Sequence, residues 1–331
     1  MNTNESSVCH QPDYSIVVPV YFNEGSLREL VATVRGEILG KVEGRRGEII
    51  FVDDGSGDGS YQLLRELQRT YPADIRAVKL SRNFGQVNAI WCGLTLAPAA
   101  VVVMSADGQD DPCHALTMLQ AHFAGEAEIV IATRESREES IYRRGTSRIF
   151  YWLMRKLSFA EMPLGGFDFF LLGPKARRAL LTGYQHHGFL QGQVLQLGFR
   201  RQFLKYRRIA RRHGASRWSF ARKLTYLMDG VLGYSYLPIR FMSLLGVFCS
   251  TLGFLYACVV FVARLVLNNP VQGWAPLMMA ILLIGGMQML MLGVIGEYLW
   301  RVFAQVRGSS PYIVEEVLDD TEGCKHKDDS A

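Results

Sequence analysis

EIIFVDDGSGD (residues 48–58) is a short apolar run that ends in two carboxylates and a glycine-rich turn. An apolar run without polar alternation is typical of a strand that is covered on both faces. A second such run, SIVVPVY (15–21), precedes it, and a helical pattern that begins at Ser26 lies between the two. Strand, helix and strand in this order predict a unit with two parallel strands.

The alternation of strands and helices continues beyond this unit. Helical patterns begin near Gly59 and Gln86, and the further apolar runs are IRAVKLS (75–81), VVVMSAD (101–107) and EIVIATR (128–134). We therefore predict an α/β fold whose mostly parallel sheet is covered by helices on both faces. Ligands of such sheets bind beyond the carboxyl ends of the strands. Asp53, Asp54 and Asp107 lie at two of those ends.

The turn GSGDGS (55–60) is similar to the glycine-rich loop that binds dinucleotides. Two carboxylates stand directly before it, Asp58 lies inside it, and Ser60 replaces the last glycine. These acidic groups disfavour a bound pyrophosphate. A carboxylate at this strand end, Asp53, is better suited to accept hydrogen bonds from a base imide and a ribose.

The second acidic constellation is DGQDD (107–111). Hard oxygen ligands at a strand end suit Mg²⁺ or Mn²⁺ that bridges a diphosphate. The alternative is a turn in which an Asp caps the helix that starts at Pro112. The proximity of Asp53, one strand away, favours a joint nucleotide and metal site.

Composition limits the class of protein. The chain has 331 residues, of which 49% are apolar and 20% charged, and its mean hydropathy is +0.09. These values exclude a disordered chain, a collagen and a disulfide-stapled mini-protein. Its 67 charged residues are too many for a many-pass transporter. A soluble block joined to a small membrane block fits both observations.

Two uncharged runs near the C-terminus, 241–263 and 274–296, identify that membrane block. Each is 23 residues long, or roughly 35 Å as a helix, which is enough to cross a hydrocarbon core. A buried soluble helix is the alternative. Since the connection 264–273 is short and contains Asn-Asn-Pro, the pair predicts a transmembrane hairpin.

Basic residues give the orientation of this hairpin. There are 11 Lys and Arg between Arg200 and Arg240, but only Arg264 in the connection. Both ends of the hairpin, and the soluble block with both termini, are therefore expected in the cytosol at the inner membrane. The N-terminus carries no basic and apolar signal pattern.

The stretch 169–228 has 13 Lys and Arg and no acidic residue. It can rest on anionic lipid headgroups or hold phosphate groups, and both interpretations stay open. IYRRGTSRIFYWLMRKL (141–157) and 221–238 mix basic and aromatic residues as interfacial helices do. Nucleic acid is disfavoured by the adjacent apolar runs. The tail EEVLDDTEGCKHKDDSA (315–331) is polar and acidic and predicts disorder.

Several stretches together resemble one family; they are PVYFNE (19–24), VDDGSGD (52–58), SRNFGQ (81–86), MSADGQDDP (104–112) and the basic segment before the hairpin. The chain resembles a family-two glycosyltransferase of the GT-A fold, in the polyprenyl-phosphate branch that includes dolichol-phosphate mannose synthase and the bactoprenol glucosyltransferases. The resemblance runs from about residue 14 to about 312. It implies an inverting transfer of a sugar from a nucleotide diphosphate, expected to be a UDP-sugar, to a membrane polyprenyl phosphate.

The resemblance also implies roles for single residues. The expected nucleotide-binding residues are Pro19, Tyr21, Glu24, Asp53, Ala106, Asp107, Arg211 and Arg217. Asp107 and Gln109 would hold Mg²⁺ or Mn²⁺, and Asp168 in GGFDFFLLGPKA (165–176) would be the catalytic carboxylate. Residues expected at the acceptor phosphate are Arg134, Arg137 and Ser216. The expected partners are the nucleotide sugar, polyprenyl phosphate and membrane lipids, with self-association left open.

Three positions depart from the pattern of the family. Phe22 is an additional residue between Tyr21 and Asn23. Ser105 stands where the family has the first Asp of its D-x-D motif, and Phe170 stands where it has an Arg. Ser105 and Phe170 keep open a non-catalytic membrane scaffold. A processive polysaccharide synthase is a second alternative, although the Gln of its Q-x-x-R-W motif is absent before Arg217.

The expected organisation divides the chain into five parts. These are a flexible N-terminus (1–13), a catalytic GT-A domain (14–220), a juxtamembrane interface helix (221–240), a transmembrane hairpin (241–300) and a cytosolic C-terminal tail (301–331).

Overall fold

The computed structural model describes residues 11–134, 155, 161–163, 166–185, 188–206, 237–266, 274–308 and 310–319. It divides into two compact units. The first consists of Met1–Tyr184, Gly188–Lys223 and Ser310–Ala331, and the second of Gln185–His187 and Leu224–Ser309. The first unit therefore contains chain from both sides of the second.

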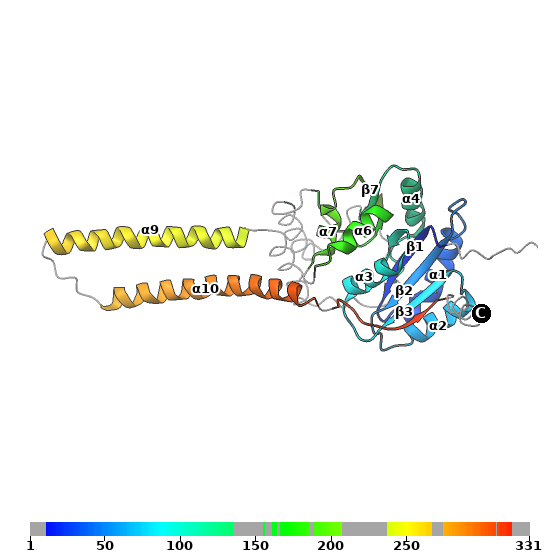
Figure 1. The fold of residues 1–331 in the computed structure, drawn as a ribbon, viewed down its shortest axis with the longest axis horizontal. Coiled ribbons are helices and arrows are strands. Elements are labelled where there is room, and N and C mark those ends of the chain that lie inside the picture. The colour runs from blue at the N-terminus through cyan, green and yellow to red at the C-terminus, as the bar shows by residue number, and fades with distance from the viewer. Residues whose placement is uncertain are drawn as a thin grey trace, which may run out of the picture. The chain divides into compact units, whose positions relative to one another are not determined.

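The first unit is built on one mixed, mostly parallel sheet (Figure 1). The strand order is β7-β5-β6-β4-β1-β2-β3-β8. The strands are β1 (Tyr14–Val20), β2 (Gly47–Asp53), β3 (Ile75–Leu80), β4 (Ala100–Val103), β5 (Ile129–Arg134), β6 (Phe170–Leu172), β7 (Arg201–Tyr206) and β8 (Val314–Leu318). Only β6 and β8 run antiparallel to their neighbours among the described strands. The predicted α/β sheet is confirmed.

Helices cover both faces of this sheet. They are α1 (Glu24–Glu37), α2 (Ser60–Thr70), α3 (Gln86–Leu96), α4 (Pro112–Phe123), α6 (Pro174–Thr182) and α7 (Leu190–Gln196). All seven residues of β1 are buried, which explains why its sequence is apolar on both sides. Gly93 lets α3 approach β1 closely, because a Cβ at this position would lie 2.4 Å from Val17 Cγ1.

Strand β8 corrects the prediction of a disordered tail. Val314–Leu318 pairs antiparallel with β3, so that prediction is wrong for residues 315–318. Glu316 accepts hydrogen bonds from Tyr61 Oη and Arg65 Nη2, both at 2.9 Å, and Glu315 lies 2.9 Å from Lys79 Nζ. Basic and tyrosyl side chains of β3 and α2 thus complement an acidic strand.

The end of β7 and the start of β8 lie at the same edge of the sheet. Strand β7 is parallel to β5 and ends at Tyr206, on the carboxyl edge of the parallel strands. Strand β8 starts at Val314, which pairs with Leu80 at the carboxyl end of β3. Asp53, which ends β2, lies at this same edge.

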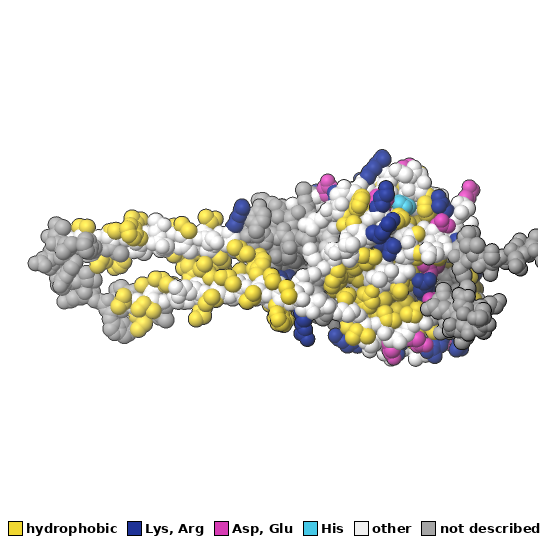
Figure 2. Space-filling model, viewed as in Figure 1, with side chains coloured by type: hydrophobic (Ala, Val, Ile, Leu, Met, Phe, Trp, Pro, Cys, Tyr) yellow, Lys and Arg dark blue, Asp and Glu magenta, His cyan; other side chains and the backbone are white. Residues whose placement is uncertain are grey.

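The second unit contains two long apolar helices, α9 (Leu237–Val266) and α10 (Trp274–Arg307). Two segments are long and apolar enough to cross a membrane: Ile239–Val260, with mean hydropathy 2.0, and Leu283–Arg307, with 1.3. Neither is buried, and hydrophobic side chains are exposed along both helices (Figure 2). The two helices lie side by side, since a Cβ at Gly246 would be 3.7 Å from Met291 Cε.

Helix α10 extends past the predicted end of its span at residue 296. Its 34 residues correspond to roughly 51 Å at 1.5 Å per residue, more than a hydrocarbon core of about 30 Å requires. Glu297 and Arg301 form an ion pair of 3.0 Å on the additional turns. The helix therefore continues beyond its uncharged part with charged side chains placed among exposed apolar ones.

Candidate active site

Asp53, at the end of β2, is a buried carboxylate with an unused acceptor. Its side chain is 0% exposed, and Oδ2 accepts a hydrogen bond from Ser56 N at 3.1 Å. Among the described residues, Asp53 Oδ1 has no hydrogen-bond partner. Burial raises the pKa of this carboxyl group. An acceptor of this kind can take a hydrogen bond from an N–H or O–H donor, and the predicted contact of Asp53 with the base stays a prediction.

Asp54 holds a neighbouring loop, a role that sequence reasoning missed. Its Oδ1 accepts from Phe84 N at 2.7 Å and its Oδ2 from Gly85 N at 2.9 Å. Gly55 adopts φ +67, and a Cβ there would lie only 2.6 Å from the carbonyl carbon of Arg82. This glycine of the turn 55–60 therefore serves the close packing of two loops.

Phe22, the additional residue between Tyr21 and Asn23, lies in the turn that follows β1. Phe22 adopts φ 57 and is the one non-glycine residue with positive φ among those described. That conformation is strained for a bulky side chain. The Tyr21 and Phe22 rings meet edge-on, with centroids 4.7 Å apart, and Phe22 N donates to Ser56 Oγ at 3.1 Å. The insertion is thus accommodated in a tight turn that contacts the loop after β2.

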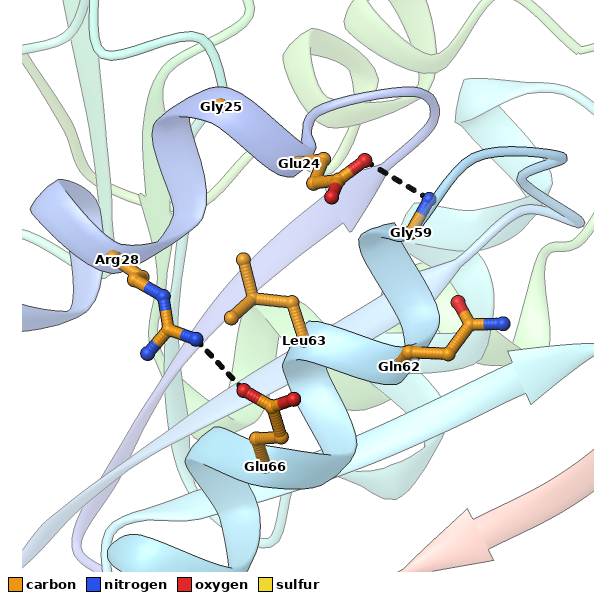
Figure 3. A pocket seen from close by; sticks show the side chains of 7 residues that line it. All are labelled: Glu24, Gly25, Arg28, Gly59, Gln62, Leu63 and Glu66. Carbon is orange, nitrogen blue, oxygen red and sulfur yellow. Dashed lines mark hydrogen bonds and ion pairs between the residues drawn. The ribbon is translucent and has the colours of Figure 1, made fainter.

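Glu24 lies at the start of α1 and faces α2. Its Oε2 accepts a hydrogen bond from Gly59 N at 3.0 Å. Figure 3 shows that it borders an open groove between α1 and α2, where Arg28 Nη2 and Glu66 Oε2 form an ion pair of 2.7 Å. This groove contains none of the other predicted site residues. Glu24 therefore ties the ends of β1 and β2 together.

The loop after β4 brings a serine and two carboxylates into contact. Ser105 Oγ lies 2.7 Å from Asp107 Oδ1 and 2.6 Å from Asp110 Oδ2. Asp107 Oδ1 also accepts from Gln109 N at 3.1 Å. The Ala106 carbonyl accepts a hydrogen bond from Ser26 Oγ at 2.6 Å, which fixes this loop to α1.

Asp168 precedes β6 and is exposed. Gln191 Nε2 donates to Phe167 O at 2.9 Å and lies 3.3 Å from Asp168 Oδ1. Phe170, which replaces an Arg of the family pattern, is 1% exposed and packs against Phe167 at 5.8 Å between ring centroids. Its side chain therefore belongs to the core, while Asp168 remains accessible at the strand end.

Tyr206, the last residue of β7, connects two of these segments. Its hydroxyl donates to Asp110 Oδ1 at 3.0 Å. Its ring packs edge-on against Phe169, the neighbour of Asp168, at 5.8 Å between centroids. The sequence places Asp110 in the acidic stretch 107–111, but no pattern marks Tyr206 as its partner, because 96 positions separate the two residues.

Two family models match this chain. "Glycosyl transferase family 2" matches residues 15–182, and "GtrB C-terminal hairpin" matches residues 237–302. The chain belongs to glycosyl transferase family 2. The predicted family and the predicted enzyme class, a glycosyltransferase, are thereby confirmed.

Curated relatives of this family 2 glycosyltransferase match it over nearly their whole length. An uncharacterized glycosyltransferase, YkcC, of Bacillus subtilis is 33% identical over 305 residues, which cover 92% of this chain and 93% of YkcC. The bactoprenol glucosyl transferase of Shigella phage SfII is 28% identical over 304 residues, covering 91% and 97%.

Solved structures are more distant. The mannosyltransferase PcManGT of Pyrobaculum calidifontis, in complex with GDP-Man and Mn²⁺, is 16% identical with a TM-score of 0.47, covering 67% of this chain and 64% of its own. TarS 1–349 of S. aureus is 19% identical with a TM-score of 0.41, and the match spans 59% of either chain.

Some predicted site residues of the glycosyltransferase lie outside the described residues. These are Arg137, Arg211, Ser216 and Arg217, together with most of the segments 141–157 and 221–240. Arg134 ends β5 and pairs in register with Tyr206. Asp53, Ala106, Asp107, Gln109 and Asp168 all lie at the carboxyl edge of the sheet or just beyond it, and their roles stay predictions.

The residues at the β4 end fit a divalent cation held mainly by substrate. Among the described residues, no three His, Cys, Asp or Glu side chains gather as a metal site. Mg²⁺ commonly uses one or two carboxylates together with substrate phosphates and water. The half-buried Asp107 carboxylate beside the Ser105 hydroxyl provides hard oxygen donors of this kind.

Proposed function

We propose that this glycosyltransferase moves a sugar, with inversion, from a UDP-sugar to a membrane polyprenyl phosphate. The observation that carries the proposal is the joining of a family 2 domain to a GtrB-type hairpin in one chain. The bactoprenol glucosyl transferase of phage SfII is matched across both parts. An acceptor anchored in a membrane explains why a transferase carries two exposed apolar helices.

The donor is expected at the ends of β2 and β4. Asp53 Oδ1 is placed to accept a hydrogen bond from the base, since it has no partner among the described residues. Asp107 and Gln109 would hold Mg²⁺ or Mn²⁺. When bound, the cation would neutralise charge on the departing diphosphate.

The reaction needs little proton transfer. An ionised oxygen of the acceptor phosphate attacks the anomeric carbon, a new C–O bond forms, and the bond from that carbon to the nucleotide diphosphate breaks. Because the acceptor is already ionised at pH 7, a strong general base is unnecessary. The exposed Asp168 carboxylate is expected to orient groups and to stabilise positive charge on the sugar carbon.

The acceptor phosphate is expected among basic groups near the same edge. Arg134, Arg137 and Ser216 are proposed to bind it, and Arg211 and Arg217 to bind the donor diphosphate, since Arg suits phosphate oxygens. The excess of Lys and Arg before α9 supports a cytosolic active site, with both termini in the cytosol.

The test is a direct search for the lipid product. Membranes containing the full chain are incubated with a panel of labelled nucleotide sugars and undecaprenyl phosphate, and the lipids are extracted and weighed by mass spectrometry. A lipid carrying one sugar on one phosphate is expected with a UDP-sugar and Mg²⁺ or Mn²⁺. A sugar polymer would favour the processive synthase, and no turnover with any donor would favour the scaffold.

A further inference from the structure

The hydroxyl group of Ser105 contacts two carboxylate oxygens but has only one proton to donate. Its Oγ lies 2.7 Å from Asp107 Oδ1 and 2.6 Å from Asp110 Oδ2. A hydroxyl group has one proton and can donate it to one of these oxygens at a time. The other contact is favourable if that carboxyl group is protonated and donates to Oγ, or if a cation or another donor compensates the charge of the facing oxygens.

Asp110 is a fixed and buried acceptor for this proton. Its side chain is 2% exposed, and its Oδ2 also accepts from Ser105 N at 3.1 Å. Its Oδ1 accepts from Tyr206 Oη at 3.0 Å. A carboxylate thus lies beside the position where the family has an acidic residue and this chain has Ser105.

A purely local role in the start of α4 does not explain Asp110. The N-cap of α4 is Asp111, whose Oδ1 accepts from Cys113 N at 2.9 Å. Asp110 instead turns away from the helix start, toward the end of β7. The ring of Tyr206 packs against Phe169 at 5.8 Å and His114 at 5.5 Å, which holds the phenol in place.

We propose that Asp110 and Tyr206 are positioning residues for the cation carboxylate Asp107. When the cation binds, the Ser105 proton is donated to Asp110, and Asp107 Oδ1 turns from that proton to the cation. The proton stays on Ser105 Oγ throughout, and only its acceptor changes. Tyr206 keeps Asp110 in place for this exchange. The inference rests on the proposed function, because it assumes a cation bound with a nucleotide diphosphate.

The test measures cation affinity rather than turnover. The full chain in detergent is saturated with UDP, or in parallel with GDP, and free Mn²⁺ is followed by electron paramagnetic resonance. Tyr206→Phe keeps the ring and removes the hydroxyl. We expect its Mn²⁺ dissociation constant to rise by about three- to tenfold, the range for one lost buried hydrogen bond. Asp110→Asn is expected to raise it at least as much.

Tyr14→Phe is the matched control. Tyr14 is also fully buried, and its hydroxyl bonds to Ile38 O at 3.3 Å, at the amino edge of the sheet. This variant is expected to change the melting temperature and leave the Mn²⁺ affinity unchanged. An equal loss of affinity in Tyr14→Phe and Tyr206→Phe would mean general loosening of the fold and would overturn the proposal.

A double variant tests the chain of contacts itself. Ser105→Ala removes the exchanging proton, so the effects of Ser105→Ala and Tyr206→Phe on Mn²⁺ affinity should be less than additive. Full additivity, or unchanged affinity in Tyr206→Phe, refutes the positioning role. If the unaltered protein fails to bind Mn²⁺ both in the presence of UDP and in the presence of GDP, the proposed function itself fails. This outcome is visible before any variant is compared. Tyr206→Phe suffices if Asp110→Asn does not fold.

Discussion

Asp53 combines complete burial with an ionisable group, and this has a consequence for stability. Burial raises its pKa, whereas the unfolded chain keeps a value near about 3.9. The folded state therefore binds the proton more tightly. This contribution to stability is fully present below the unfolded pKa and is lost as pH rises through the folded pKa. At pH values above the unfolded pKa, Asp53 therefore lowers the stability of the protein without nucleotide.

Asp53→Asn should therefore stabilise the protein and weaken nucleotide binding together. At pH 7.5 we expect the melting temperature to rise by roughly 2–4 °C, with a smaller gain at pH 5, while UDP affinity falls. Thermal melts at both pH values and calorimetric titration with UDP measure the two effects. Glu48→Gln is the control, since Glu48 is also buried with a raised pKa but lies at the amino edge. A loss of UDP affinity in Glu48→Gln would contradict the assignment.

Asp168→Asn should separate turnover from donor binding. The side chain is exposed and contacts Gln191, so the substitution preserves shape and removes charge. We expect kcat to fall by roughly ten- to a hundredfold with little change in KM for the nucleotide sugar. Steady-state kinetics of lipid glycosylation measure both values, and Asp13→Asn at the amino edge serves as the control. Unchanged kcat would place the chemistry elsewhere.

At the scale of single residues, the sequence predicted the position of side chains that directly follow a strand. Asp53 and Asp107 directly follow apolar runs, so their place could be inferred. The contacts of Asp54 with Phe84 and of Asp110 with Tyr206 could not be predicted, because they span 30 and 96 positions. Such contacts exist only once the sheet has brought distant segments together.

At the scale of elements, the strands with a recognisable sequence pattern were predicted, and the strands without one were not. The five predicted strands are mostly buried and rich in apolar residues, although Arg76 and Lys79 interrupt β3. Strand β6 has only three residues, and the edge strands β7 and β8 are polar, so none of the three has that pattern. Strand β8 forms because Lys79, Tyr61 and Arg65 complement its glutamates.

Removal of β8 should destabilise the first unit. Truncation after residue 309 takes away the pairing of Val314–Leu318 with β3. Ladder hydrogen bonds contribute about 0.5–1.5 kcal/mol each, so we expect the melting temperature to fall by at least about 4 °C. Truncation after residue 319 keeps the strand and should leave the melting temperature unchanged. Equal melting of both truncated proteins would show that β8 contributes nothing measurable.

At the scale of the whole molecule, charge and apolar surface are distributed in blocks along the chain. The 60 residues from 169 to 228 contain 13 Lys and Arg without an acid, and the apolar helices follow. The net charge of +5 is therefore not an average property of the surface. The excess of basic residues lies in the sequence directly before the apolar helices, and under the proposed function it would serve the anionic lipid acceptor.

Cysteine labelling can test the proposed orientation of the hairpin. Asn269→Cys in the connection between α9 and α10 should react in intact cells with a membrane-impermeant maleimide. Ser310→Cys, which follows α10, should react only after the cells are opened. We expect this result because basic residues favour the cytosolic side: the connection has one basic residue, whereas the stretch from Arg200 to Arg240 has 11. Labelling of Ser310→Cys in intact cells would reverse the orientation.

The return of the chain to the sheet at β8 also sets an order of events during synthesis. A ribosome completes α9 and α10 before it reaches Val314, so the β3 edge is unpaired while the hairpin emerges. Folding of the catalytic unit during translation therefore cannot finish before the apolar helices have been made. A nascent chain that fails to insert would carry both exposed apolar helices and an open sheet edge, and proteases and chaperones recognise such features. Under the proposed membrane location, synthesis of the hairpin thus precedes completion of the catalytic sheet.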